Sequence, residues 1–195
     1  MSVAEVLREA VDRHGDRLVM LCSFQKEESV LIDELVKIAP DARIVTIDTG
    51  VLFPETLATW RAFEARFGVD VRIEDATGDW TGPAQCCGDR KVAALERALT
   101  GVDAWITGIR REQSPTRANA QPVEFDDKRG LWKYNPLVEW TEKDLWNRIF
   151  ERDLPYHPLH DQGYSSIGCA PCTNPGSGRE GRWAGLTKTE CGLHV

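Results

Sequence analysis

The sequence predicts an α/β fold with a single doubly wound, mainly parallel sheet and a cysteine-bearing tail at the C-terminus. Short, continuous apolar runs are typical of strands buried on both faces, and segments of helical periodicity alternate with them. The connections between these segments are short, as they are in parallel sheets with crossover helices. Ligands bind such sheets beyond the carboxyl ends of the strands, so loops 23–29, 48–53 and 108–117 are expected to open at one site.

Each element follows from its own residues. The expected order is helix 3–13, strand 18–22, a helix through Leu31, Leu35 and Ile38, strand 44–47, helix 54–67, strand 69–73, helix 91–99 and strand 104–107. Pro40 ends the second helix, Pro54 begins the third, and Gly68 and Gly101 follow the ends of the third and fourth.

The alternation of apolar runs and helical segments ends after residue 110. A polar segment without periodicity runs to about Gly130, and Thr141 and Asp144 then form a capping box for a helix over 141–150. Residues 153–195 contain Pro, Gly, Cys and His with little periodicity. We therefore expect a nucleotide-binding part over 1–152 and a site-covering tail over 153–195 that belongs to the same domain.

Composition narrows the classes of function. At 195 residues the chain has the size of one domain with a tail, and its formal net charge of −7 argues against a nucleic-acid binder. The charged N-terminus has no apolar stretch of signal-peptide length, and no apolar window is long enough to cross a bilayer. A cytoplasmic protein is therefore expected, in which six cysteines indicate metal or redox chemistry rather than disulfides. The oligomeric state stays open, a homo-oligomer included.

Four cysteines form two pairs. Cys86 and Cys87 are adjacent, whereas Cys169 and Cys172 form a C-x-x-C motif far along the chain. Four thiolates satisfy either a tetrahedral zinc ion or a [4Fe–4S] cube, and the spacing does not choose between them, although adjacent cysteines suit the separate corners of a cube somewhat better. A zinc-stabilised binding module is the corresponding alternative. Cys22 lies in an apolar strand and is expected to be a buried, inert thiol.

Cys191 lies four residues from the C-terminus and is a candidate nucleophile. Such a thiol suits a covalent relay, in which an intermediate is presented to a second protein. Attack at neutral pH requires cationic neighbours that favour the thiolate, and His194 is one candidate. Other basic side chains gather in the loops, and arginines among them suit phosphate or sulfate oxygens: Lys91, Arg110, Arg111, Arg117, Arg179 and Arg182. Loop 23–29 has no Walker A motif, but Ser23 and Gln25 could help to cradle an anion at a helix N-terminus.

These residues resemble one known family. The motifs are Cys86-Cys87 with Arg90-Lys91, the run Gly108 to Ser114 with Arg117, Asn135-Pro136-Leu137, the run Pro158 to Tyr164, Ile167-Gly168-Cys169 and Glu190-Cys191-Gly192-Leu193-His194. Together they are similar to the assimilatory adenylyl-sulfate reductases of the phosphoadenylyl-sulfate reductase family. The resemblance covers the chain from Cys22 onward.

The resemblance implies a fold like that of the adenine-nucleotide PP-loop enzymes, adenylyl sulfate as substrate, a [4Fe–4S] cluster and thioredoxin as reductant. By motif, Cys86, Cys87, Cys169 and Cys172 would ligate the cluster, and Cys191 would be the nucleophile that forms an S-sulfocysteine. The side chains facing the phosphosulfate would be Lys91, Arg117, Arg179, Arg182 and His194, with Ser23 and Gln25 in the nucleotide loop. The alternatives are a 3′-phosphoadenylyl-sulfate or dual-substrate reductase and, more distantly, an ATP-dependent enzyme of the PP-loop group.

Overall fold

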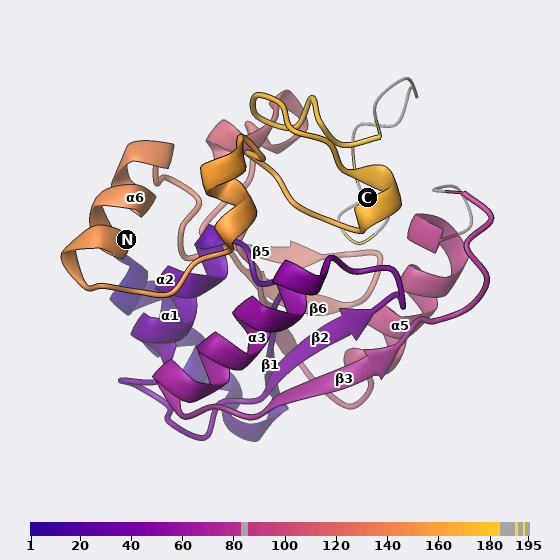
Figure 1. Ribbon diagram of the computed structural model, residues 1–195. Helices are drawn as coiled ribbons and strands as arrows, with labels where there is room; N and C mark the ends of the chain where they lie inside the picture. Colours follow the sequence, from indigo (N-terminus) through magenta and orange to yellow (C-terminus); the bar gives the residue numbers. More distant parts are fainter. Residues whose placement is uncertain (83–85, 184–189, 191–192, 194–195) are drawn as a thin grey trace.

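The chain forms one six-stranded sheet with helices on both faces (Figure 1). This computed structural model describes residues 1–82, 86–183, 190 and 193, apart from the side chains of residues 86 and 87. The strand order is β3-β2-β1-β4-β6-β5. Because the chain places β2 and β3 on one side of β1 and β4 on the other, the direction of winding reverses between β1 and β4.

All strand pairs are parallel except the last. The strands are β1 (Leu18–Leu21), β2 (Ile44–Asp48), β3 (Val71–Asp75), β4 (Ala104–Ile106), β5 (Val123–Asp126) and β6 (Leu131–Tyr134). Strand β6 runs parallel to β4, and only β5 is antiparallel, to β6. The predicted doubly wound, mainly parallel sheet is confirmed, with the third strand beginning two residues later than expected.

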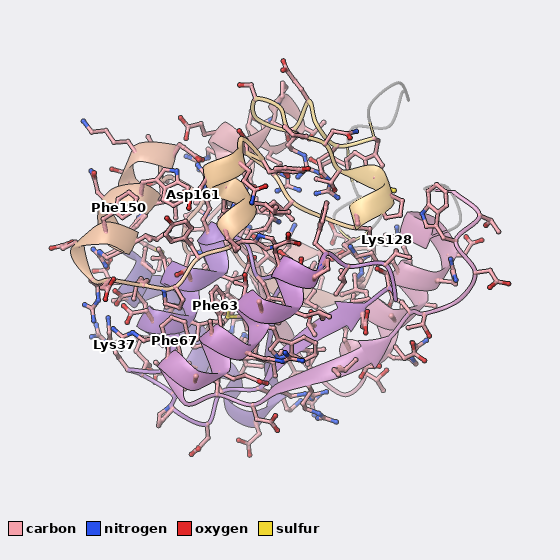
Figure 2. The ribbon with its side chains drawn as sticks, viewed as in Figure 1. Lys37, Phe63, Phe67, Lys128, Phe150 and Asp161 are labelled. Atoms are coloured by element: carbon pink, nitrogen blue, oxygen red, sulfur yellow. The ribbon has the colours of Figure 1, made fainter. Side chains whose placement is uncertain are left out.

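Alternate residues of each central strand enter two separate hydrophobic layers. Met20, Ile44 and Ile106 pack with α1 (Val3–His14), α2 (Lys26–Leu35), α3 (Pro54–Phe67) and α6 (Glu142–Glu151). Val19 and Trp105, which are paired in register, face α5 (Lys91–Ala98) on the opposite side. Figure 2 shows Phe63 and Phe67 on α3, where their rings meet edge to face with centroids 5.6 Å apart.

Two expectations need correction. The polar segment to Gly130 was expected to lack regular structure, but it contains β5, and the turn after it leads into β6. The loop expected over 23–29 is shorter, because α2 already begins at Lys26 and Glu28 accepts the backbone N–H of Gln25 as its N-terminal cap. The predicted capping box of α6 is confirmed by hydrogen bonds in both directions between Thr141 and Asp144.

The segment after α6 returns across the carboxyl ends of the strands (Figure 1). It contains two short 3₁₀ turns, Pro158–Gln162 and Ala170–Cys172. Backbone hydrogen bonds and side chains fasten it to the sheet domain: Ala170 N donates to the Val51 carbonyl at 2.8 Å, and Lys26 Nζ donates to the Ser165 carbonyl at 2.7 Å. Within the described ranges, no helix combines the length and the apolar character that crossing a bilayer requires.

Candidate functional site

A cavity opens where the winding of the sheet reverses. It encloses about 880 Å³ of space between its lining atoms, including the space open to solvent at its mouth. The loop after β1, the end of β2, and Thr107 and Gly108 after β4 supply its floor. Its upper wall comes from the start of α5 and from the C-terminal segment, including Ile167, Gly168 and Leu193. We call it the central pocket.

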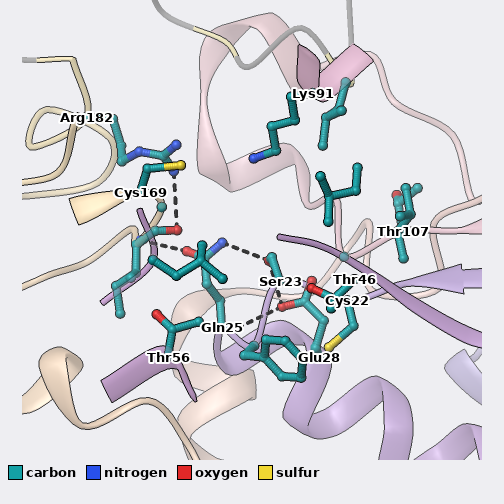
Figure 3. A pocket seen from close by; sticks show the side chains of 18 residues that line it. Cys22, Ser23, Gln25, Glu28, Thr46, Thr56, Lys91, Thr107, Cys169 and Arg182 are labelled. Carbon is teal, nitrogen blue, oxygen red and sulfur yellow. Dashed lines mark hydrogen bonds between the residues drawn. The ribbon is translucent and has the colours of Figure 1, made fainter. Parts of the chain in front are cut away.

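The loop after β1 is held rigidly by a hydrogen-bonded chain at the floor of the central pocket (Figure 3). Gln25 Nε2 donates to Ser23 Oγ at 3.2 Å, and Ser23 Oγ donates to Glu28 Oε2 at 3.2 Å. The side-chain oxygen Oε1 of Gln25 accepts the backbone N–H of Ile167 at 2.8 Å. Ser23 and Gln25, both predicted to cradle an anion, therefore lie together in the pocket, and Gln25 links its floor to the C-terminal segment.

Glu28 carries the one carboxylate among the described residues that line the central pocket. Burial raises the pKa of Glu28 to about 8, and the neighbouring Glu27 carboxylate adds to this effect. Glu28 therefore holds a proton at neutral pH, so the floor presents a neutral acid rather than a negative charge. Its oxygen lies so near Gly108 that a Cβ there would come within 2.7 Å of it. Sequence reasoning missed Glu28, because it appears as one of five charged or polar residues in a row, from Gln25 to Ser29.

Two of the predicted cations reach the central pocket from opposite sides. Lys91, the first residue of α5, and Arg182, from the C-terminal segment, both line it, and Figure 3 shows them above Ser23 and Gln25. Arg182 is buried, and its Nη1 donates to the Ile167 carbonyl at 3.3 Å. Its guanidinium lies 4.5 Å from the centre of the Trp183 ring, a cation–π contact that limits its movement. This pair of cations gives the pocket a positive wall.

Arg117 and Arg179, predicted to face the same anion, are instead paired with a carboxylate of the chain. Arg117 donates from Nε and Nη2 to the two oxygens of Glu190 at 3.0 and 2.8 Å. Arg179 Nη2 donates to Glu190 Oε2 at 3.2 Å. Neither arginine is among the residues that line the central pocket. The structure thus divides the predicted cations into a pocket pair and a pair that binds Glu190.

Arg110 also has a structural partner, which the sequence did not indicate. It is buried, and it pairs with Glu27 at 3.0 Å and with Glu142 of α6 at 2.9 Å. Lys26 pairs with Glu142 at 3.1 Å. Burial alone would raise the pKa of Glu27, but Lys26 and Arg110 outweigh it and lower that pKa to about 2. Arg110 therefore joins α2 to α6 beside the pocket.

The C-x-x-C pair lies at the rim of the central pocket. Cys169 and Cys172 are both buried, and the Cys169 sulfur lies 3.2 Å from Thr49 Oγ1. Burial, and then Cys169, raise the pKa of the Cys172 thiol, whereas Lys91 and Arg182 oppose that rise. Lys91 directly follows the π-helical turn Cys86–Arg90, which carries the other predicted pair. Both cysteine-bearing segments thus meet at one end of α5.

Some predicted site residues cannot be placed. Among the described side chains, no three from His, Cys, Asp and Glu stand close enough to bind a metal ion, and those of Cys86 and Cys87 are outside this set. Cys191 and His194 also lie outside the described residues. Cys22 is a buried residue of the pocket lining, and burial raises the pKa of its thiol well above the ordinary value, as expected for an inert cysteine.

Comparison with known proteins agrees with this architecture. Residues 17–175 match the family model described as the phosphoadenosine phosphosulfate reductase domain. The adenosine 5′-phosphosulfate reductase of Geobacillus kaustophilus is 47% identical, over 98% of this chain and 89% of the relative. A protein of Gloeobacter violaceus named phosphoadenosine 5′-phosphosulfate reductase is 45% identical, over 97% of this chain and 87% of the relative.

Solved structures agree as well. The phosphoadenylyl-sulfate reductase of Candida auris, crystallised with phosphate, has a TM-score of 0.75 and 29% identity, over 89% of this chain and 91% of that chain. An FMN adenylyltransferase of Candida glabrata has a TM-score of 0.69 at 15% identity, over 90% of this chain and 65% of that chain, which supports the PP-loop-like fold alone. Because the family model covers most of the chain and the sequence relatives align nearly end to end, this chain belongs to the phosphoadenosine phosphosulfate reductase family.

Proposed function

We propose that the chain reduces adenylyl sulfate to sulfite and AMP in assimilatory sulfate reduction, in the cytoplasm, with thioredoxin as the reductant. The observation that carries this proposal is the central pocket: Lys91 and Arg182 meet above Ser23 and Gln25 at the reversal of the sheet. Two cations over a neutral polar floor suit the oxygens of a phosphosulfate. The names of relatives at 44–47% identity supply the substrate class.

The reaction brings two anions together, and the pocket lowers that barrier. At 4 Å, two unit charges repel by about 1 kcal/mol in water and several-fold more in a drier cleft. Lys91 and Arg182 would offset this repulsion and stabilise the charge that develops on the leaving AMP. The protonated state of Glu28 has the same effect, because an ionised carboxyl at the floor would repel the nucleotide.

The proposed chemistry runs through Cys191. Its thiolate attacks the sulfur of adenylyl sulfate, the bond from that sulfur to the bridging oxygen breaks, and AMP leaves with the bond electrons. The product on the enzyme is an S-sulfocysteine. A thioredoxin thiolate then attacks the Cys191 sulfur and releases sulfite, and the second thioredoxin thiol resolves the mixed disulfide, so that thioredoxin supplies both electrons.

We also propose that Cys86, Cys87, Cys169 and Cys172 hold a [4Fe–4S] cluster. The donor set is compatible with this group: Cys169 and Cys172 are buried close together, and the turn carrying the other pair ends at Arg90, directly before Lys91, whose charge acts on Cys172. Such a cluster would supply a fixed charged centre that ties the C-terminal segment to α5. Iron and sulfide analysis of protein purified without oxygen tests this. Zinc as the bound metal would overturn it and favour the structural-zinc alternative.

One experiment tests the activity. Purified protein with thioredoxin and its reductase is given adenylyl sulfate or 3′-phosphoadenylyl sulfate, and AMP or its 3′-phosphorylated form is measured together with sulfite. Cys191→Ser is expected to abolish both sulfite release and a gel-stable sulfonated adduct, whereas Cys22→Ser is a matched thiol control that should retain the adduct. An adduct that persists in Cys191→Ser would remove Cys191 from its role.

The phosphorylated nucleotide is the second candidate substrate. The Gloeobacter violaceus relative at 45% identity is named for it, nearly level with relatives that are named for adenylyl sulfate. Overall identity therefore does not separate the two substrates. The ratio of kcat/KM for the two nucleotides in the same assay decides between them.

A further inference from the structure

Glu28 is a buried carboxyl group that forms no ion pair with any described residue. Only 5% of the residue is exposed, and because it lines the central pocket, that part opens into the pocket. The neighbouring carboxylate, Glu27, takes the buried Arg110 as its partner. A buried carboxyl group without a counter-charge is more stable in its neutral form. Glu28 can therefore donate a hydrogen bond as well as accept one.

The two side-chain oxygens of Glu28 have different surroundings. The hydrogen bonds that other described residues donate to it both go to Oε2, from Ser23 Oγ at 3.2 Å and from the backbone N–H of Gln25 at 3.0 Å. Oε1 lies beside Gly108, which also lines the pocket, and the lack of a Cβ there leaves room for it. Since Oε2 is the acceptor, the proton belongs on Oε1. Figure 3 shows the carboxyl group pointing from α2 into the pocket.

The charges and the apolar residues of the pocket indicate which part of a nucleotide meets this oxygen. Lys91 and Arg182 lie on the upper wall, so the phosphosulfate is expected there. Apolar side chains complete the lining around the floor, among them Leu21, Ile47 and Leu52. A nucleotide bound with its anionic end at the cations therefore presents its nucleoside to the floor. The uncharged acceptors of that nucleoside are the ring nitrogens of the purine and the oxygens of the ribose.

We propose that Glu28 is a specificity-determining residue, whose neutral carboxyl group donates a hydrogen bond from Oε1 to an uncharged acceptor of the bound nucleoside, either a purine ring nitrogen or a ribose oxygen. This inference rests on the function proposed above, which supplies the nucleotide. Ionisation of Glu28 would remove the donor and place a negative charge against that acceptor. Recognition of the nucleoside thus requires the proton on Glu28, and the bound nucleoside in turn retains that proton.

The groups around Glu28 determine the pH at which the proton leaves. Burial and the Glu27 carboxylate raise its pKa to about 8, against the lowering effect of the hydrogen bonds from Gln25 and Ser23. Other charged or titratable side chains that adjoin it or line the pocket come from α2, from the segments after β1 and β4, from α5 and from the C-terminal segment: Lys26, Glu27, Cys22, Arg110, Lys91, Cys169 and Arg182. All of these remain in a Glu28→Gln variant. The difference in pH dependence between wild type and this variant therefore reports the ionisation of Glu28.

The first test measures the Kd for AMP by calorimetry in wild type, Glu28→Gln and Glu28→Met. Methionine has a similar length but no donor, so at about pH 7 the Kd of Glu28→Met should exceed that of wild type by about threefold to tenfold. Glutamine can donate from its amide, so Glu28→Gln should lie nearer to wild type. Binding by the neutral form is present below the pKa of about 8 and is lost above it, so the Kd of wild type should then rise by up to about tenfold per pH unit relative to Glu28→Gln. Glu151→Gln, which removes an exposed carboxylate of α6, is the matched control and should follow wild type.

A second test identifies the acceptor atom and excludes an indirect effect through the fold. AMP is compared with analogues that each lack one acceptor: 1-deaza-AMP, 3-deaza-AMP, 7-deaza-AMP, 2′-deoxy-AMP and 3′-deoxy-AMP. One of them should bind wild type about threefold to tenfold more weakly than AMP does, yet bind Glu28→Met almost as well as AMP, because both changes remove the same hydrogen bond. A deaza analogue would place Glu28 at the purine, and a deoxy analogue would place it at the ribose. Should Glu28→Met fold poorly, wild type above pH 8 takes its place, since the ionised carboxyl group has lost the same donor.

Three results would overturn the proposal. A constant ratio of Kd between wild type and Glu28→Gln from about pH 7 to pH 9.5 would show that binding does not need the proton. A wild-type affinity that rises with pH relative to Glu28→Gln would make the ionised carboxylate the binding form. Equal losses for every analogue in wild type and Glu28→Met would show that Glu28 does not contact the nucleoside. Failure of wild type to bind AMP at any pH would refute the proposed function itself, whereas AMP binding to which Glu28 contributes nothing would refute this inference alone.

Discussion

Replacement of Glu28 by glutamine should make the stability of this protein less dependent on pH. Glutamine has nearly the same shape, and its carbonyl oxygen can accept the hydrogen bonds from Ser23 Oγ and the Gln25 backbone N–H that Glu28 Oε2 now accepts. It removes only the ability to ionise. The variant therefore isolates the cost of a negative charge at the floor of the central pocket.

The magnitude follows from the two protonation states. The pKa of Glu28 is raised from 4.5 to about 8, so the folded protein binds this proton more tightly than the unfolded chain does. The resulting stabilisation is fully present below pH 4.5 and is lost as the pH rises to about 8. Across this window, the stability of wild type relative to Glu28→Gln should fall by up to about 1.4 kcal/mol per pH unit, to a limit of about 5 kcal/mol.

Urea unfolding followed by circular dichroism, at pH values between 5 and 9, measures this difference. Each kcal/mol gained by Glu28→Gln should also raise Tm by about 2–4 °C relative to wild type. Glu180→Gln, which removes an exposed carboxylate, is the matched control and should follow wild type at every pH. A constant difference between Glu28→Gln and wild type from pH 5 to 9 would show that Glu28 is ionised in the folded protein, and would refute the reasoning.

Other predictions concern the walls of the central pocket and the ion pairs beside it. Lys91→Ala should weaken AMP binding by on the order of tenfold with iron content unchanged, whereas a defect confined to iron content, measured on the same samples, would count against a ligand role for Lys91. Gly168→Ala should weaken AMP binding at an unchanged circular dichroism spectrum, because the added methyl group would collide with the Arg182 guanidinium; an unaltered Kd would contradict that contact. Glu27→Gln should destabilise the protein at pH 7 by about 3 kcal/mol, since it leaves Arg110 and Lys26 with fewer counter-charges. The pKa of Glu27 in the folded protein is about 2, so its contribution to stability is present above pH 4.5 and is lost as the pH falls towards 2. The stability of Glu27→Gln should accordingly fall less steeply than that of wild type between pH 4.5 and 2. An equal fall in both proteins would argue against the ion pairs of Glu27.

The parallel part of the sheet was predictable because its strands are buried on both faces. Such strands are continuous apolar runs, and the alternation with helices then determines their direction. The β5–β6 hairpin was missed for the opposite reason. β5 is an edge strand in which Glu124 and Asp126 flank Phe125, and Phe125 is 47% exposed, so its composition resembles that of a loop. Its pairing with β6 comes from tertiary contacts that composition does not reveal.

The candidate site was predictable at the level of residue types and less so at the level of partners. The family resemblance named Lys91, Arg182, Ser23 and Gln25 as site residues, and all four line the central pocket. The counter-charges were not predictable, because Glu190 lies 73 residues from Arg117, and Glu27 lies 83 residues from Arg110. Only the fold brings such pairs together, so a list of basic residues overestimates the charge that a pocket offers to a ligand.

Strand β1 has only four residues, yet it is paired on both edges and contributes to both hydrophobic layers. A single inserted or deleted residue would exchange Val19 and Met20 between the layers and rotate Ser23 away from the opening. Insertions and deletions in β1 should therefore disrupt the fold, whereas insertions and deletions in the turn between β5 and β6 should be tolerated. Strand β1 is therefore expected to tolerate a change of length least, because a shift by one residue there alters both the packing of the two hydrophobic layers and the position of Ser23 in the central pocket.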